Sequence, residues 1–201
     1  MKALAVALPM TALVALSAQA QQVFKTDLGD IRVETVVSGL SNPWGLAFLP
    51  DGRMLVTERP GRMRIATRDG TLSAPIAGVP KVLAQNQGGL LDVIVDRDFA
   101  KNSTIYFCYA DPVDGGGAQT ALARATLDDG NPPKLTNVKR IFRQDGPPSN
   151  GLHFGCRIVQ ARDGNLFLTT GDHYGPRDLA QTLDNHLGKV IRIAPDGSVP
   201  K

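Results

Sequence analysis

Residues 43–57 read Pro-Trp-Gly-Leu-Ala-Phe-Leu-Pro-Asp-Gly-Arg-Met-Leu-Val-Thr. Two apolar runs, 44–48 and 53–57, flank the turn sequence Pro50-Asp51-Gly52. An Asp-Gly pair between apolar runs supplies the positive φ that a tight hairpin turn requires. The stretch therefore predicts strand, turn and strand, and a second hairpin of the same kind is predicted over residues 62–72.

The same pattern returns near the end of the chain. Residues 156–169 repeat the first hairpin, and residues 189–197 repeat the second. A degenerate copy spans residues 89–126. Antiparallel units repeating at roughly 40 to 50 residues are typical of propeller blades. The chain is therefore predicted to be all-β, with about three blades of an incomplete β-propeller. A small open β-sandwich is the alternative fold.

Helical periodicity is nearly absent, and only residues 178–183 suggest a short helix. Residues 1–20 have a Lys2 n-region, an apolar run and a small-residue ending, which predicts a signal peptide cleaved before Gln21. The expected domain is then a partial propeller over residues 21–201. No other stretch reaches transmembrane length, so we expect a periplasmic or secreted protein without a membrane span.

The formal net charge is +3, and Lys and Arg are spread along the chain. This distribution gives no electrostatic footprint for nucleic acid. The two cysteines, Cys108 and Cys156, lie in apolar strand-like runs. An exported protein permits a disulfide between them, but two separately buried thiols fit the sequence equally well.

Polar residues capable of chemistry gather in three loops, at residues 85–89, 149–157 and 171–174. His153 begins one strand of a predicted hairpin and Asp172 follows its partner strand, so both lie at the same end and Asp172 can reach His153. A carboxylate behind an imidazole fixes the imidazole's tautomer and suits it to act as a general base. An ordinary structural hydrogen bond is the alternative interpretation.

Other polar residues have simpler interpretations. His173 and His186 have no partners at a spacing typical of zinc, so we expect surface or loop positions for them. Asp92 and Asp96 alternate with valines, and this alternation predicts the solvated face of a strand.

Four ordered motifs resemble the glucose/sorbosone dehydrogenase family, and most closely its soluble aldose sugar dehydrogenases that depend on pyrroloquinoline quinone (PQQ). They lie at residues 39–52, 87–92, 153–157 and 188–200. The resemblance covers about residues 30–201, which is nearly all of the predicted mature chain.

The resemblance implies a six-bladed propeller with PQQ on its top face. His153 corresponds to the general base, next to the cofactor, that takes the sugar hydroxyl proton while hydride passes from C1 to the quinone. Asp172 corresponds to the residue that orients this base beside the substrate, and Gln87 to a residue lining the cofactor and substrate site. Leu152 stands where the family sometimes has an acidic residue, which removes that contact to the sugar.

The resemblance also implies calcium as a second cofactor and an aldose, oxidised to a lactone, as the substrate. The family's Arg-Asn pair, its basic residues for the PQQ carboxylates and its calcium ligands fall after residue 201, so no metal ligand is predicted here. Residues 21–201 alone are therefore expected to show little PQQ-dependent activity. The sequence does not identify the electron acceptor. The alternative functions are a non-catalytic propeller binding module and a metal-dependent lactonase.

Overall fold

The computed structural model describes residues 22–201, which fall into two units divided after Val36. The first unit is an antiparallel hairpin of β1 (Gln22–Thr26) and β2 (Gly29–Val33), with every side chain exposed. The predicted signal peptide and its cleavage before Gln21 lie outside the described residues. No helix in residues 22–201 has the length and apolar character needed to cross a bilayer.

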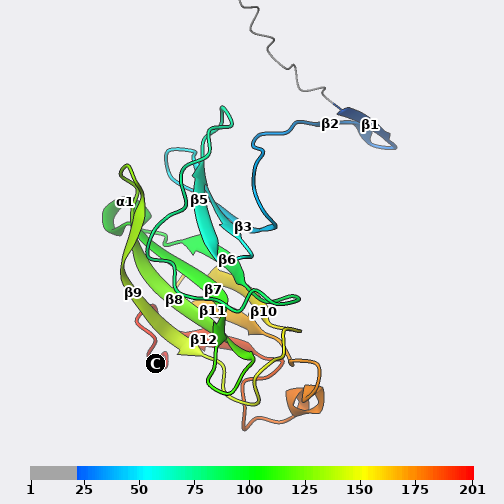
Figure 1. Ribbon diagram of the computed structural model, residues 1–201, viewed down its shortest axis with the longest axis vertical. Helices are drawn as coiled ribbons and strands as arrows, with labels where there is room; N and C mark the ends of the chain where they lie inside the picture. Colours follow the sequence, from blue (N-terminus) through cyan, green and yellow to red (C-terminus); the bar gives the residue numbers. More distant parts are fainter. Residues whose placement is uncertain (1–21) are drawn as a thin grey trace, which may run out of the picture. The chain divides into compact units, whose positions relative to one another are not determined.

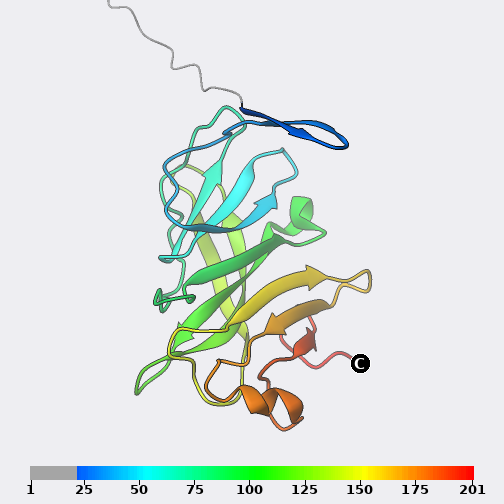
Figure 2. The same ribbon diagram turned by 90° about the vertical axis from the view of Figure 1, so that its right-hand side faces the viewer.

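The second unit consists of three antiparallel sheets that follow one another in the sequence (Figures 1 and 2). The first sheet contains β3 (Pro43–Phe48), β4 (Met54–Glu58) and β5 (Arg62–Ala66). The second contains β6 (Leu90–Val95), β7 (Thr104–Pro112), β8 (Ala118–Asp128) and β9 (Lys134–Arg143). The third contains β10 (Gly155–Gln160), β11 (Leu166–Thr170) and β12 (Val190–Ile193).

Helical structure in the described residues is limited to the single turn α1 (Phe99–Asn102) and a 3-10 helix over Arg177–Gln181. The latter coincides with the short helix predicted near residue 178. Figure 2 shows the middle sheet, drawn in green, between the other two. Three sheets packed in succession confirm the all-β partial propeller, because a sandwich would consist of two sheets only.

The middle sheet buries both of its faces. On β7 the side chains of Ile105 and Phe107 pack with those of the first sheet in one apolar cluster. The alternate side chains of Tyr106 and Cys108 pack with those of the third sheet in another cluster. Successive side chains of a strand point to opposite faces, so β7 joins the two neighbouring sheets. A disulfide between Cys108 and Cys156 of β10, with Cα atoms 5.7 Å apart, adds a covalent link between the second and third sheets.

This two-sided burial overturns one prediction. Asp92 and Asp96 on and after β6 are only 1% and 7% exposed, so the predicted solvated face is wrong. Asp92 accepts hydrogen bonds from the Ile158 backbone, at 2.8 Å, and from Arg157, at 3.0 Å. Asp96 accepts one from the Tyr106 hydroxyl at 3.0 Å. Polar alternation marks solvent only where one face of the sheet is free, and here the third sheet covers it.

Each sheet begins with a strand that is interrupted at an equivalent place. The pairing register shifts between Pro43 and Leu46 in β3, and between Leu90 and Val93 in β6. In β10 it shifts between Gly155 and Ile158. An extra residue in one strand bends it and re-aims the side chains beside it. The repeated irregularity therefore bends the same end of all three first strands, where the polar loops lie.

We expect removal of the disulfide to destabilise the second unit. The cysteines are 48 residues apart, and the loss of a link closing a loop of that length costs about 4 kcal/mol in the chain-entropy account. Guanidinium unfolding of the Cys108→Ala/Cys156→Ala double variant should show a lower midpoint than the oxidised protein. Reduction of the native protein should lower its midpoint similarly. Equal midpoints would show that the bridge contributes nothing.

Candidate active site

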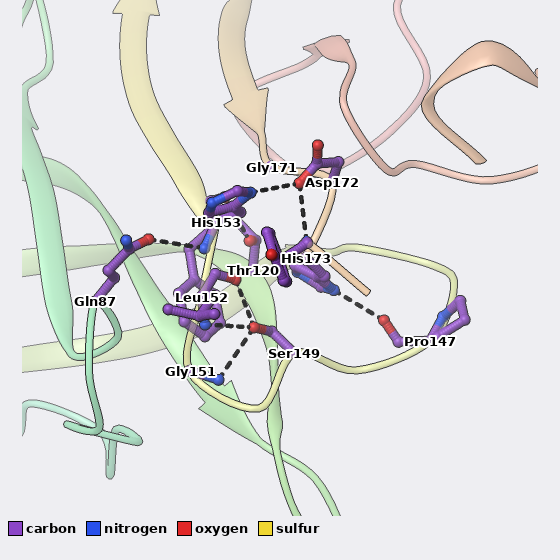
Figure 3. A network of polar contacts seen from close by, with 12 residues as sticks. Gln87, Thr120, Pro147, Ser149, Gly151, Leu152, His153, Gly171, Asp172 and His173 are labelled. Carbon is purple, nitrogen blue, oxygen red and sulfur yellow. Dashed lines mark hydrogen bonds and ion pairs between the residues drawn. The ribbon is translucent and has the colours of Figure 1, made fainter. Parts of the chain in front are cut away.

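The three polar loops predicted from the sequence meet at one end of the second and third sheets (Figure 3). Gln87 precedes β6, His153 precedes β10, and Asp172 follows β11. Gly155 pairs with Thr170 across the hairpin, so the residues just outside this pair lie at the same end. The structure thus brings all three predicted site residues together.

His153 and Asp172 form a hydrogen-bonded pair. The Nδ1 atom of His153 lies 2.8 Å from Oδ1 of Asp172, with the side chains 40% and 32% exposed. An ionised carboxylate only accepts hydrogen bonds, so Nδ1 carries the proton and Nε2 keeps a free lone pair. The Tyr174 backbone N–H donates to the same Oδ1 at 2.9 Å. This bond, aided by His153, holds the pKa of Asp172 below its usual value, so Asp172 is ionised at neutral pH.

Gln87 positions the histidine from the neighbouring sheet. Its side-chain Oε1 accepts a hydrogen bond from the His153 backbone N–H at 2.9 Å. Its own backbone N–H donates to the Gly151 carbonyl at 2.9 Å. Gln87 therefore fixes the backbone of His153. Of the polar groups of the Gln87 side chain, Nε2 is left to contact a ligand.

The turn before His153 is ordered by Ser149, the first residue of the predicted polar loop at residues 149–157, for which the sequence predicted no role of its own. The buried Ser149 hydroxyl oxygen accepts from the backbone N–H groups of Gly151, at 3.1 Å, and Leu152, at 2.8 Å. Its hydroxyl donates to the Leu152 carbonyl. A Ser in a Ser-Asn-Gly sequence is typical of such turns, but the sequence does not reveal that this one is buried.

The backbone of the site is held in unusual conformations. The φ values of His153, His173 and Tyr174 are 51°, 61° and 63°. These values lie in the left-handed region, which residues other than glycine rarely adopt. Gly171 lies directly against His153, because a Cβ at residue 171 would fall 1.6 Å from the His153 carbonyl oxygen. Only glycine allows this approach, which brings Asp172 to the imidazole.

His173 lies in a loop, one of the two positions predicted for it, but it is buried rather than at the surface. It is 4% exposed, its Nδ1–H donates to the Pro147 carbonyl at 2.8 Å, and its ring contacts Phe154 edge-on at 5.6 Å. Its backbone N–H donates to the His153 carbonyl, and its side chain turns inward, away from solvent. Burial lowers the pKa of His173, and the ring is therefore neutral. His186 is half-buried, and its Nδ1 accepts the Asp145 backbone N–H at 3.0 Å.

A second group of residues joins all three sheets beside this pair. The Arg157 guanidinium bonds Asp92 at 3.0 Å and lies 5.5 Å from the centre of the Trp44 ring. Burial raises the pKa of Asp92, and the Arg157 guanidinium partly offsets that effect. Trp44 also lines a depression of about 330 Å³. The other residues lining it are Asn42, Pro43, Arg59 and Gln87.

The described residues contain no group of three or more His, Cys, Asp or Glu side chains arranged to hold a metal ion.

Comparison with known proteins identifies the family of the chain. The family model described as Glucose / Sorbosone dehydrogenase matches residues 40–201. The Aldose sugar dehydrogenase YliI of Escherichia coli is 42% identical over 171 residues, which cover 85% of this chain and 46% of that protein.

Two solved structures are similar to most of this chain in fold. The apo form of the soluble aldose sugar dehydrogenase from Escherichia coli is 42% identical with a TM-score of 0.77, over 83% of this chain and 48% of that one. The PQQ-bound aldose sugar dehydrogenase from Streptomyces coelicolor is 30% identical with a TM-score of 0.72, over 82% and 48%. The chain thus spans about half the length of the relatives it matches.

We expect His173 to make stability pH-dependent. Its pKa is lower in the folded state than the value of 6.5 for an unperturbed histidine, so its contribution is complete above that value and is lost as the pH falls below it. Between about pH 7.5 and pH 5.5, the protein should lose about 1 kcal/mol more unfolding free energy than His173→Gln. Urea unfolding at both pH values measures this. Parallel losses in the two proteins would contradict the buried neutral histidine.

Proposed function

Because the chain belongs to the glucose/sorbosone dehydrogenase family, we propose that its protein oxidises the C1 hydroxyl of aldose sugars to lactones with PQQ as cofactor. The observation that carries the proposal is the pairing of His153 with Asp172 at an exposed loop end. The names of the relatives, which include an aldose sugar dehydrogenase and a PQQ-bound one, support the same activity.

His153 acts as the general base. Its Nδ1–H is held by Asp172, so Nε2 is the atom that accepts the proton of the sugar's C1 hydroxyl. The imidazolium that forms is stabilised by the ionised Asp172, which lies in hydrogen-bonding contact. Gln87 keeps the His153 backbone in place while the ring receives the proton. The 40% exposure of the His153 side chain leaves room for a substrate hydroxyl.

The residues present fit a quinone next to the base. His153 is exposed, the Gln87 Nε2 group has no protein partner among the described residues, and the adjoining depression of about 330 Å³ offers space and polar groups. When bound there, PQQ would accept the hydride that leaves C1. Calcium is proposed only from the family resemblance, and we assign no step to it.

We also propose that the protein works in the periplasm or outside the cell. The predicted signal peptide over residues 1–20 supports this location. The Cys108–Cys156 disulfide supports it as well, since such bonds persist in oxidising compartments and are rare in the cytosol.

Substitution of either member of the pair should slow turnover strongly. In the polypeptide as its organism makes it, supplied with PQQ and calcium, His153→Ala should lower kcat for glucose by about 100-fold or more. Asp172→Asn should lower it by about 10-fold to 100-fold, because an amide does not stabilise the imidazolium. Dye reduction measures these rates.

The matched control is Asp178→Asn, the same change at an exposed position in the 3-10 helix that follows Asp172 along the chain. It should retain the full rate. If His153→Ala turned over as fast as the unmodified protein, His153 would not be the base. If the unmodified protein bound sugar but reduced no dye, the alternative of a non-catalytic binding module would replace the dehydrogenase.

A further inference from the structure

Arg59 joins the loops that surround the depression beside Gln87. Its backbone N–H donates to the Asn42 carbonyl at 3.0 Å, and its carbonyl accepts the Leu90 backbone N–H at 3.0 Å. Its guanidinium Nη1 donates to the Asn86 carbonyl. Both the main chain and the side chain of this half-buried residue are therefore fixed at the wall of the depression.

The charge of Arg59 has no acidic partner in the described part of the chain. The neighbouring acid, Glu58, is fully buried and accepts two hydrogen bonds from Arg62, at 2.8 and 3.0 Å. Arg157, the other guanidinium close to Trp44, is neutralised by Asp92. A guanidinium has five N–H donors, and among residues 22–201 the Arg59 guanidinium donates to a single acceptor, the neutral Asn86 carbonyl. Arg59 therefore keeps both charge and donors for a ligand.

The rest of the lining suits an oxygen-rich organic ligand. Asn42 and Gln87 provide amide groups, and Trp44 provides part of an aromatic surface. Gln87 is also bonded to the His153 backbone, so the depression adjoins the proposed base directly. Guanidinium groups bind carboxylates through paired, charge-assisted hydrogen bonds, which a neutral sugar hydroxyl cannot match.

We propose that this depression is a carboxylate-binding subsite in which Arg59 supplies the positive charge. The inference rests on the proposed dehydrogenase function, and it extends the substrate class to aldoses that carry a carboxylate away from C1. The same chemistry would also recognise a carboxylate of PQQ. The two sources can be told apart by which affinity depends on Arg59. If Arg59 binds a sugar carboxylate, its loss weakens the binding of acidic sugars only. If it binds a cofactor carboxylate, its loss weakens the binding of PQQ.

The test uses Arg59→Gln, which removes the charge, and Arg59→Lys, which keeps it. Arg68→Gln is the matched control, because Arg68 is exposed and lies at the opposite end of β5 from the depression. All are made in the polypeptide as its organism produces it. Thermal unfolding checks that each variant folds, since Arg59 also holds the loop at Asn86.

Binding is measured without turnover. PQQ is titrated by quenching of tryptophan fluorescence, to which Trp44 contributes from the wall of the depression. Glucuronate and glucose are titrated by calorimetry without PQQ, so that no sugar is oxidised. If the carboxylate belongs to the sugar, Arg59→Gln should weaken glucuronate binding by about 10-fold or more and leave glucose and PQQ within about twofold. If it belongs to the cofactor, PQQ binding should weaken by about 10-fold.

In either case Arg59→Lys should recover part of the affinity, and Arg68→Gln should match the unmodified protein. The subsite is refuted if glucuronate and PQQ bind Arg59→Gln as tightly as the unmodified protein, or if neither binds the unmodified protein. If glucuronate binding depended on Arg59 but no sugar were oxidised, the subsite would be supported and the dehydrogenase proposal would be contradicted.

Discussion

Burial of the middle sheet on both faces fixes the relation between neighbouring sheets. Phe107 packs toward the first sheet and Tyr106 toward the third, so one strand carries side chains of both apolar clusters. Because packed interiors tolerate little displacement, the loops of adjacent sheets are held in register at their ends. The hydrogen bond from His153 to Gln87 depends on this register, since it joins residues of two sheets.

Buried polar groups reinforce the same register. Asp92 accepts hydrogen bonds from the backbone and from Arg157 of the third sheet, and Asp96 binds Tyr106 within its own sheet and Gln160 in the third. An unpaired buried carboxylate is strongly destabilising, so these contacts form only when the sheets are correctly placed. The apolar contacts provide most of the attraction between the sheets, and the buried acids select one alignment.

Local chemistry predicted much of this structure, and tertiary packing decided the rest. Asp-Gly turns marked the hairpins, and antiparallel geometry was enough to place Asp172 within reach of His153. The sequence left the state of Cys108 open, because a pairing between sheets depends on how blades stack. The burial of Asp92 and His173 was missed for the same reason. Strand β9 was not predicted either, because its mostly exposed polar residues show no clear alternation of apolar and polar side chains.

The charges around His153 bear on which ligands the proposed site would favour. Asp172 is hydrogen-bonded to His153, and Leu152 contributes no second carboxylate next to the imidazole. Arg59, in contrast, brings a positive charge without an acidic partner in the described residues. An anion entering this region therefore gains attraction from Arg59 and meets one carboxylate that is already engaged. Charge of this kind favours acidic ligands over neutral ones, because the attraction is strongest where the cation is partly shielded from water.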